Sequence, residues 1–169
     1  MGTIGHYDFA SGSMSDDYEF HTDFPGPHPQ GSLIEVDGKL YGMTLTGGET
    51  NRGVLFEWDI AQGVYTKKID FGSQGLFNPY STLSYVDGKV YGSTYSSLFE
   101  WDIATNVIDV KVQLDVNKGV EQHGTMVYVN GKFYGVTTSG GINTPSKGYG
   151  GVIFEWDPVN NVYTVKHKF

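Results

Sequence analysis

The sequence predicts an all-β fold built from repeated four-stranded antiparallel sheets, and three observations lead to this prediction. One module occurs three times and ends each time in Phe-Glu-Trp-Asp, at Asp59, Asp102 and Asp157. The 169 residues include 24 glycines and 15% aromatic residues but only 18% charged residues, which is typical of one globular β domain. Short segments rich in β-branched and aromatic residues alternate with turn residues, as strands do.

The first complete copy shows how one unit is expected to fold. Asp37-Gly38 stands between two apolar segments and is a strong signal for a two-residue hairpin turn. A second turn, at residues 60–63, joins the Phe-Glu-Trp-Asp segment to the next apolar run. The expected strands a, b, c and d cover residues 32–36, 39–44, 53–59 and 64–71.

The other copies follow the same plan. The second runs over residues 82–114 and the third over residues 125–169. At the amino terminus, residues 7–12 align with residues 58–63, and residues 18–24 align with residues 65–71 if residues 13–16 are a four-residue insertion. The chain therefore begins with strands c and d of a unit whose strands a and b are missing.

A repeated meander of about 45 residues is the signature of β-propeller blades. Both faces of such a sheet must be covered, which explains why Phe56 and Trp58 point one way and Leu55 the other. A solenoid or an open stack of sheets would bury the same faces and is the structural alternative. The predicted array of about three and a half blades comprises a half-blade at residues 1–26 and blades at residues 27–73, 79–116 and 122–169.

The strand count bears on assembly, because closed propellers typically have four to eight blades. Three explanations stay open: the sequence is part of a longer repeat chain, two chains complete one ring, or units stack head to tail. The second and third explanations predict a homo-oligomer.

Two stretches carry a family resemblance. The first consists of residues 40–44, Gly47-Gly48 and residues 53–59, and the second consists of residues 133–137, Gly140-Gly141 and residues 151–157. Both resemble the Gloeobacter/Verrucomicrobia (GloVer) tandem repeat of bacterial exported proteins. More distantly they are similar to kelch blades. The resemblance implies an extracellular or surface-displayed propeller without catalytic residues. The second copy departs from the pattern, because Tyr95-Ser96-Ser97 replaces the double-glycine loop.

Charge and composition exclude several classes of function. The net charge of −8 disfavours a nucleic acid or an anionic membrane as partner, because either requires a basic surface. The absence of cysteine excludes disulfides and thiolate metal sites. No stretch reads as a signal peptide or a membrane span, so an export signal would lie outside this sequence. No cofactor is expected.

Conspicuous titratable residues were weighed for chemistry. One glutamate lies between aromatic residues in each strand c, and paired carboxylates can cleave glycosides. A structural ion pair is the preferred interpretation, because each copy also places a lysine at the start of strand b. The residues concerned are Glu57, Glu100 and Glu155, with Lys39, Lys89 and Lys132 as partners.

The histidines and the acidic pair Asp16-Asp17 do not indicate a metal or binding site. The five histidines lack metal-ligand spacing, so no metal site is expected. His28 and His123 lie in or beside d–a loops, where solvent exposure is the preferred interpretation. Asp16-Asp17 reads as an acidic surface turn.

The positions of the loops along the meander indicate which edge of the sheets is the better candidate for a binding surface. In a meander, the b–c and d–a connections share one edge of the sheet, and here they are the long ones. Function generally sits on loops that a rigid scaffold presents, although long loops can also be tolerated insertions. The candidate ligand-binding residues are Arg52, Phe77, Asn78, Tyr80, Tyr95, Gln122, His123, Asn143, Lys147 and Tyr149.

These observations give three functional hypotheses. The leading one is a non-catalytic extracellular module that binds a glycan, a peptide or a surface partner through the long loops. The alternative is a structural module that assembles with its own copies into rings or filaments. The third, a carbohydrate-active enzyme on a propeller scaffold, would need two acidic side chains, or an acid and a tyrosine, converging on the loops.

Overall fold

The structure is a computed structural model that describes residues 2–21, 28–141 and 150–169. Fourteen strands in this part of the chain form one two-stranded sheet and three four-stranded sheets, all antiparallel. The prediction of an all-β fold with four-stranded units is confirmed. We call the three large sheets blades 1, 2 and 3 and the small one the half-blade.

Each blade is a meander in which strands pair in chain order. The half-blade pairs β1 (Thr3–Asp8) with β2 (Ser13–Glu19). A short 3-10 helix, η1 (Gly72–Gln74), lies between blades 1 and 2 and was not predicted. Blade 1 contains β3 (Pro29–Val36), β4 (Lys39–Thr44), β5 (Val54–Asp59) and β6 (Val64–Asp70); blade 2 contains β7 (Ser84–Val86), β8 (Lys89–Thr94), β9 (Ser97–Asp102) and β10 (Val107–Gln113); blade 3 contains β11 (Val127–Val129), β12 (Lys132–Val136), β13 (Val152–Asp157) and β14 (Val162–Lys168).

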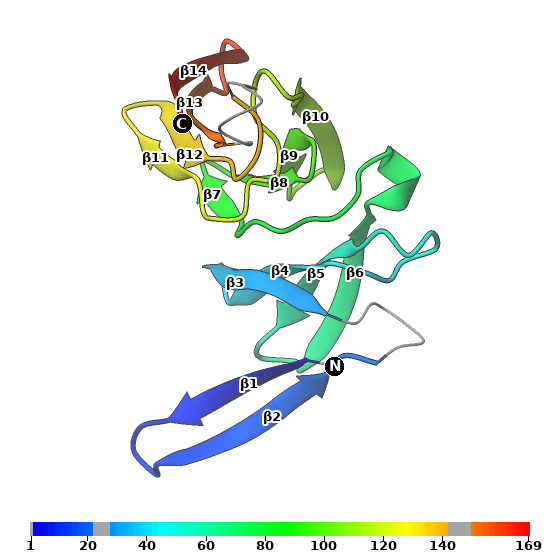
Figure 1. Cartoon of the computed structure of the whole chain (residues 1–169). Coiled ribbons are helices and arrows are strands. Elements are labelled where there is room, and N and C mark those ends of the chain that lie inside the picture. The colour runs from blue at the N-terminus through cyan, green and yellow to red at the C-terminus, as the bar shows by residue number, and fades with distance from the viewer. Residues whose placement is uncertain (1, 22–27, 142–149) are drawn as a thin grey trace.

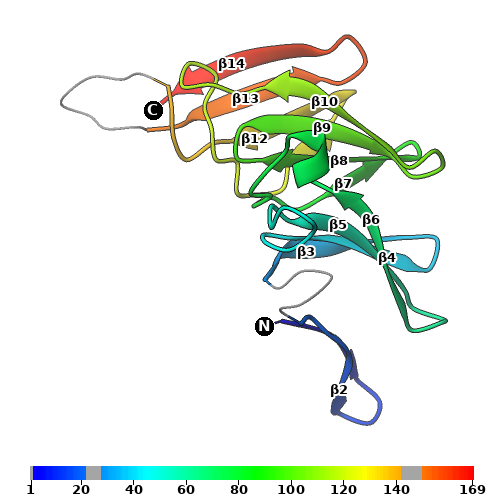
Figure 2. The same cartoon turned by 90° about the vertical axis from the view of Figure 1, so that its right-hand side faces the viewer.

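The sheets lie one upon another in chain order, with the half-blade at one end of the array and blade 3 at the other (Figures 1 and 2). Three apolar clusters fill the junctions between consecutive sheets. At the first junction Phe56 and Trp58 pack against Phe20, whereas Leu55 belongs to the junction with blade 2. The predicted alternation of strand c is confirmed, and blades 1 and 2 are covered on both faces.

Turn sterics explain the hairpins. Asp37 and Gly38 have φ values of 51° and 78°, and the equivalent Asn130 and Gly131 have 50° and 82°. Two successive residues with positive φ form the turn whose twist matches a β-hairpin, and Asp, Asn and Gly tolerate that conformation best.

The glycine that follows tyrosine in strand b has a packing role. A Cβ atom on Gly42 would lie 2.6 Å from Cζ of Phe56, its cross-strand partner in strand c. Gly92 and Gly135 face Phe99 and Phe154 in the same way. A small residue in strand b therefore makes room for a large ring in strand c, since close-packed cores leave no slack.

The half-blade corrects one prediction. It consists of strands c and d, as expected, but the insertion at residues 13–16 is wrong. Asp8 pairs with Ser13 as Asp59 pairs with Val64, and the Phe20 N–H donates to Gly2 as the Phe71 N–H donates to Gly53. The offset to blade 1 is thus 51 residues throughout. The polar run from Ser13 looked like a loop because both faces of this hairpin are largely exposed.

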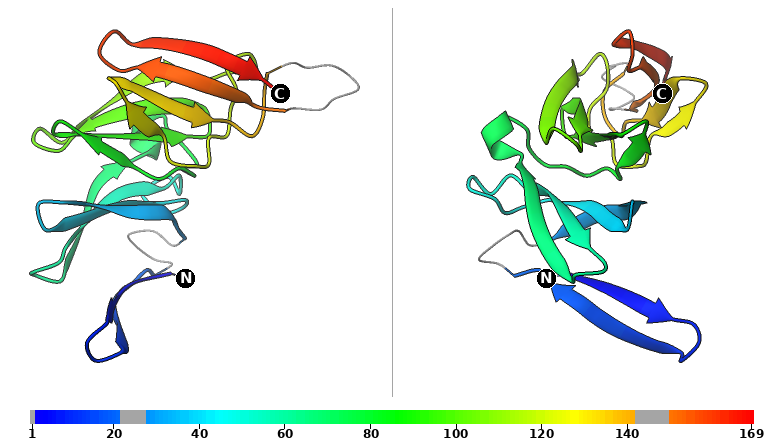
Figure 3. Two further views of the ribbon diagram at one scale, coloured as in Figure 1. Left: turned by 90° about the vertical axis from the view of Figure 1, so that its left-hand side faces the viewer. Right: turned by 180° about the vertical axis from the view of Figure 1, so that it is seen from behind.

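The two edges of the array differ. The a–b and c–d turns lie on one edge, which we call the tight-turn rim, and the longer b–c and d–a connections lie on the other, the long-loop rim (Figures 2 and 3). The clipped b–c connection of blade 2 is confirmed, because β8 ends at Thr94 and β9 begins at Ser97.

Candidate functional site

A network of charged and phenolic groups recurs in each blade beside the tight-turn rim. In blade 1, Lys39 Nζ at the start of strand b lies 2.7 Å from Glu57 Oε1. The corresponding distances in blades 2 and 3 are 2.6 Å for Lys89 and Glu100 and 2.8 Å for Lys132 and Glu155. The predicted structural ion pair is confirmed in all three copies.

The structure adds a second cation and a phenol to each glutamate. Lys68 in strand d lies 3.5 Å from Glu57, and Tyr41 Oη donates to Glu57 Oε2 at 2.9 Å. The strand-d lysines of blades 2 and 3 are Lys111 and Lys166. Sequence reasoning missed these lysines, although they recur at one repeat position.

Ionisation of these glutamates follows from the network. Burial alone raises the pKa of Glu57, but hydrogen bonds from Lys39 and Tyr41 and the charge of Lys68 outweigh it and lower the pKa below its ordinary value of 4.5. The pKa of Glu100 is lowered in the same way. Burial and the glutamate raise the pKa of Tyr41 well above its usual range. The glutamates therefore stay charged near neutral pH and cannot act as general acids there.

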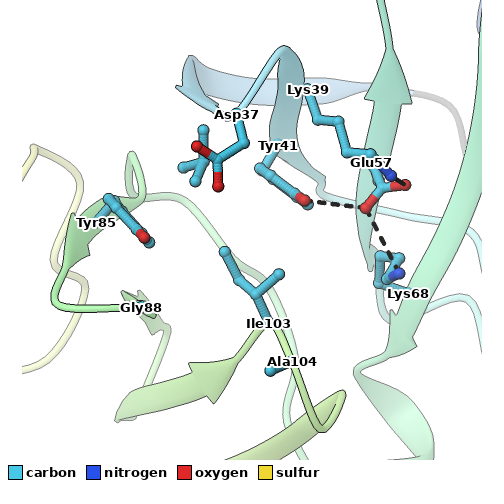
Figure 4. Close-up of a pocket in the computed structure, with 10 residues that line it drawn as sticks. Asp37, Lys39, Tyr41, Glu57, Lys68, Tyr85, Gly88, Ile103 and Ala104 are labelled. Atoms are coloured by element: carbon cyan, nitrogen blue, oxygen red, sulfur yellow. Dashed lines mark hydrogen bonds and ion pairs between the residues drawn. The ribbon is translucent and has the colours of Figure 1, made fainter.

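This network lines a cleft of about 430 Å³ between blades 1 and 2. Figure 4 shows Lys39, Tyr41 and Glu57 on one wall and Tyr85 and Ile103 on the other. A matching cleft of about 390 Å³ lies between blades 2 and 3. Because the carboxylate, the tyrosine and the lysines already bind one another, we regard these clefts as parts of the blade junctions.

On the long-loop rim, main-chain hydrogen bonds tie successive loops together. The Tyr95 N–H donates to the Phe77 carbonyl at 3.3 Å, the Glu121 N–H to the Tyr95 carbonyl at 2.9 Å, and the Thr138 N–H to the Glu121 carbonyl at 3.1 Å. This series crosses from blade 1 to blade 3. The loops are therefore fixed by the scaffold, as a binding surface requires.

Three predicted site residues form a row on this rim. The Arg52 guanidinium lies over the Phe77 ring at 5.4 Å, and the Phe77 and Tyr95 rings stack with centroids 5.8 Å apart and 25° between their planes. Arg52 is exposed, and both rings are half-buried. The structure thus brings a cation and two aromatic faces from three connections to one surface.

A second aromatic pair joins Tyr80 and His123, which stack at 4.7 Å. His123 is exposed, as expected, and Asn78 is half-buried with a φ of 53°. Gln122 is only 1% exposed, and its Oε1 accepts a hydrogen bond from Ser93 Oγ, so it serves the blade junction. Asn143, Lys147 and Tyr149 lie outside the described residues.

The row of rings borders a hollow that sequence reasoning did not define. A cavity of about 310 Å³ is lined by Tyr95, Val116, Val120, Ser139 and Gly140. Apart from Tyr95, which lies in the short b–c connection of blade 2, its walls come from two loops that had been singled out for their length. Only Tyr95 among these residues was predicted, because short apolar residues in a loop carry no chemical signal of their own.

The remaining acidic and histidine residues are scattered. Among the described residues, no three His, Cys, Asp or Glu side chains gather as a group that could hold a metal ion. Asp16 and Asp17 were predicted to form a surface turn, but they lie in β2, where Asp17 binds His6 at 2.8 Å. The described part of the chain has no helix long and apolar enough to cross a bilayer.

Comparisons with known proteins show the fold alone. No protein-family model and no curated protein matches the chain. Among solved structures, the extracellular domain of BT4673 from B. thetaiotaomicron matches with a TM-score of 0.62 and 15% identity over 90% of this chain. TolB from Acinetobacter baumannii matches with a TM-score of 0.55 and 12% identity over 98% of this chain. This chain spans only 18% and 38% of those two chains. The matches confirm the predicted β-propeller-type array.

Proposed function

We propose that this protein is a non-catalytic β-propeller module that binds a glycan at the long-loop rim. The proposal is carried by the row of Arg52, Phe77 and Tyr95 beside the 310 Å³ hollow. Half-exposed rings offer flat apolar faces for the C–H face of a sugar, and neighbouring polar groups can bind its hydroxyls. Small-molecule sites characteristically combine such apolar walls with a few polar groups.

The glutamates support a non-catalytic role. Each recurs at the same repeat position and already binds a lysine at 2.6–2.8 Å. A glycosidase instead needs two carboxyl groups facing one bond, one of them with a raised pKa. Here the glutamates of separate blades all have lowered pKa values.

An extracellular setting belongs to the same proposal. The BT4673 match is described as an extracellular domain, and the residues that resemble GloVer repeats suggest export. We propose that the protein acts outside a bacterial cell. Secretion can be tested by locating the tagged full-length gene product in cell fractions and medium, and a cytoplasmic location would contradict it.

Binding can be tested by glycan array, followed by titration of the bound glycan with single variants. We expect Phe77→Ala and Tyr95→Ala each to weaken binding by roughly tenfold, because a lost aromatic contact is worth about 1–1.5 kcal/mol. The matched control is Tyr85→Ala, which removes an exposed tyrosine on the tight-turn side. Binding that is equally sensitive to all three variants, or no glycan bound at all, would contradict the proposal.

A further inference from the structure

The b–c connection of blade 2 is too short to make the contacts that its counterparts make in blades 1 and 3. In those blades the last threonine of strand b donates to a carbonyl of the b–c loop, at 2.8 Å from Thr44 and at 3.1 Å from Thr137. In blade 2 the equivalent Thr94 Oγ1 is buried and has no hydrogen-bond partner among the described residues. Since buried hydroxyls are normally paired, the clipped connection leaves a polar group unsatisfied at the long-loop rim.

A second polar side chain beside the clipped connection also lacks its usual partner. His28, Asn78 and Glu121 occupy one repeat position in the d–a loops and have φ values of 63°, 53° and 60°. His28 Nδ1 lies 3.1 Å from Thr46 Oγ1, and Glu121 Oε2 lies 2.9 Å from Ser139 Oγ, so both bind a b–c loop. The half-buried Asn78 amide makes no hydrogen bond with any side chain or main-chain group that the structure describes. It is therefore available to a ligand that takes the place of the missing loop.

Arg52 reaches the same junction from the b–c loop of blade 1 and is the only arginine of the sequence. A Cβ atom on the next residue, Gly53, would lie 3.1 Å from Pro79 Cδ, so this loop packs against the segment that carries Asn78. The Arg52 guanidinium lies over the Phe77 ring but makes no hydrogen bond or ion pair within the described part of the chain. Its five N–H donors are therefore free to bind an acceptor from outside the protein.

The loop that carries Arg52 is held in place by its own main chain. The Gly53 N–H donates to the Gly47 carbonyl at 3.0 Å and closes the loop. Asp70, the acid beside this loop, already accepts a hydrogen bond from the Glu49 N–H at 2.7 Å. A planar guanidinium on a fixed loop, supported by an aromatic ring and without an acid of its own, is suited to bind a carboxylate through two parallel hydrogen bonds.

We propose that the glycan bound at the long-loop rim contains a carboxylated sugar and that Arg52 binds its carboxylate. This inference rests on the proposed glycan-binding function and names the class of glycan. The carboxylated sugar lies beside Tyr95, where blade 2 lacks a loop, and its hydroxyls bind the Asn78 amide, which can both donate and accept. The next sugar of the chain occupies the 310 Å³ hollow that Tyr95 borders.

The net charge of the protein limits the kind of acidic glycan. A charge of −8 repels a densely charged polyanion at long range. At physiological salt such repulsion is screened beyond about 8 Å, whereas a direct contact between one carboxylate and Arg52 is not. We therefore expect isolated carboxylated residues among neutral sugars, and not a sulfated or polyuronate chain.

The test uses the full chain and a glycan array printed in matched sets. Each oligosaccharide that ends in glucuronate, galacturonate or sialate stands beside its methyl ester, which keeps the sugar but removes the charge, and beside a sulfated counterpart. We expect the acid of at least one set to bind roughly tenfold more tightly than its ester and its sulfated counterpart, because paired charge-assisted hydrogen bonds are strong and specific in geometry.

Variants assign the preference to individual residues. Arg52→Gln should abolish the preference for the acid and leave the affinity for the ester unchanged, and Arg52→Lys should lose most of the preference because lysine lacks the paired donors. Asn78→Gly keeps the positive φ and should weaken binding of acid and ester alike. The matched control Lys166→Gln removes one positive charge beside the tight-turn rim, where this side chain is 48% exposed, and should leave the preference unchanged.

The outcomes separate this inference from the proposed function. Equal binding of acid and ester, tighter binding of the sulfated counterpart, or a preference that survives Arg52→Gln would overturn the inference, although glycan binding itself would stand. If no glycan binds, whether acidic or neutral, the proposed function fails together with the inference.

Discussion

Blade 2 and the half-blade share a backbone register but are stabilised in different ways. In blade 2, Trp101 is fully buried and donates from Nε1 to Asn106 at 3.1 Å. The equivalent residue of the half-blade, Tyr7, is 51% exposed. The repeat therefore fixes where strands pair, whereas burial of this strand-c side chain depends on strands a and b and on a preceding sheet to pack against.

Junctions between sheets differ as well. Asn106 Nδ2 donates to the Lys68 carbonyl of the preceding blade at 3.3 Å, and Asn161 Nδ2 donates to Lys111 at 2.9 Å. Blade 1 has Gly63 at this turn position, so its junction with the half-blade depends on rings such as Tyr18 and Tyr65, which stack at 4.8 Å. The difference shows that the half-blade is attached by apolar packing without this polar tie.

The largest expected difference concerns the strand-c aromatic residue. Trp101→Ala should lower the free energy of unfolding by about 3–5 kcal/mol, because it removes a buried ring and leaves a cavity. Tyr7→Ala, at the equivalent position, should change it by less than about 0.5 kcal/mol. Urea denaturation followed by circular dichroism measures both. Similar losses for the two variants would show that the half-blade is packed like a blade.

Removal of the central charged group should have a smaller effect. Glu100→Ala removes a largely buried carboxylate that Lys89 and Lys111 share. We expect the free energy of unfolding to fall by about 2 kcal/mol. His6→Ala removes an exposed ion pair, which typically contributes little. The comparison fails if His6→Ala is as destabilising as Glu100→Ala in the same denaturation experiment.

Opposite responses to pH should follow from the residues at one repeat position, which is Glu100 in blade 2 and His6 in the half-blade. The lowered pKa of Glu100 means that its stabilisation is present above about pH 4.5 and is lost as the pH falls through the folded value. The hydrogen bond with Asp17 raises the pKa of His6 above 6.5, so its stabilisation is present below that pH and is lost as the pH rises through the folded value.

This pH contrast can be measured separately in the two regions. Hydrogen exchange of β1 and β2 amides, corrected for the intrinsic rate, should speed up from about pH 6 to about pH 9. The melting temperature of the whole array should fall below about pH 4.5. If the corrected exchange rates of the half-blade do not change between about pH 6 and about pH 9, the role of the His6–Asp17 pair is contradicted.

The smallest effect comes from adding the missing tie. Gly63 has a φ of 64° and open space around its Cβ position, so Gly63→Asn can adopt the conformation of Asn106. We expect stabilisation of about 0.5–1 kcal/mol, because the introduced amide can accept a hydrogen bond from Trp58 Nε1 and donate one to a carbonyl of the half-blade, as Asn106 does with Trp101 and Lys68. Gly12→Asn, the same change at a turn with no sheet before it, is the matched control and should leave stability unchanged by thermal denaturation.

Much of the blade architecture could be predicted because its signals are local. Asp37-Gly38 specifies its turn through backbone sterics, and the period of two in residues 54–58 specifies which side chains face each neighbour. The pairing of Glu57 with Lys39 followed from their recurrence at fixed repeat positions. These features depend on residues close in sequence or on repetition, and both are visible without coordinates.

Other features could not be predicted because they depend on neighbours far apart in the chain. Gln122 looked like a polar loop residue, yet Ser93 of the adjacent blade binds it in the interior. The row of Arg52, Phe77 and Tyr95 had been assembled only as separate loop candidates. The polar β2 strand was misaligned because exposed strands show no burial pattern from which to read their register.

By itself the sequence determined the number, order and turns of the strands, because turn sterics and alternating burial act within a few residues. Only the tertiary structure decided which long loops meet, that the glutamates lie between two cations, and that His6 and Asp17 pair in the half-blade. Those outcomes depend on how one sheet packs upon the next, and side chains from separate repeats acquire their partners only when that packing is complete.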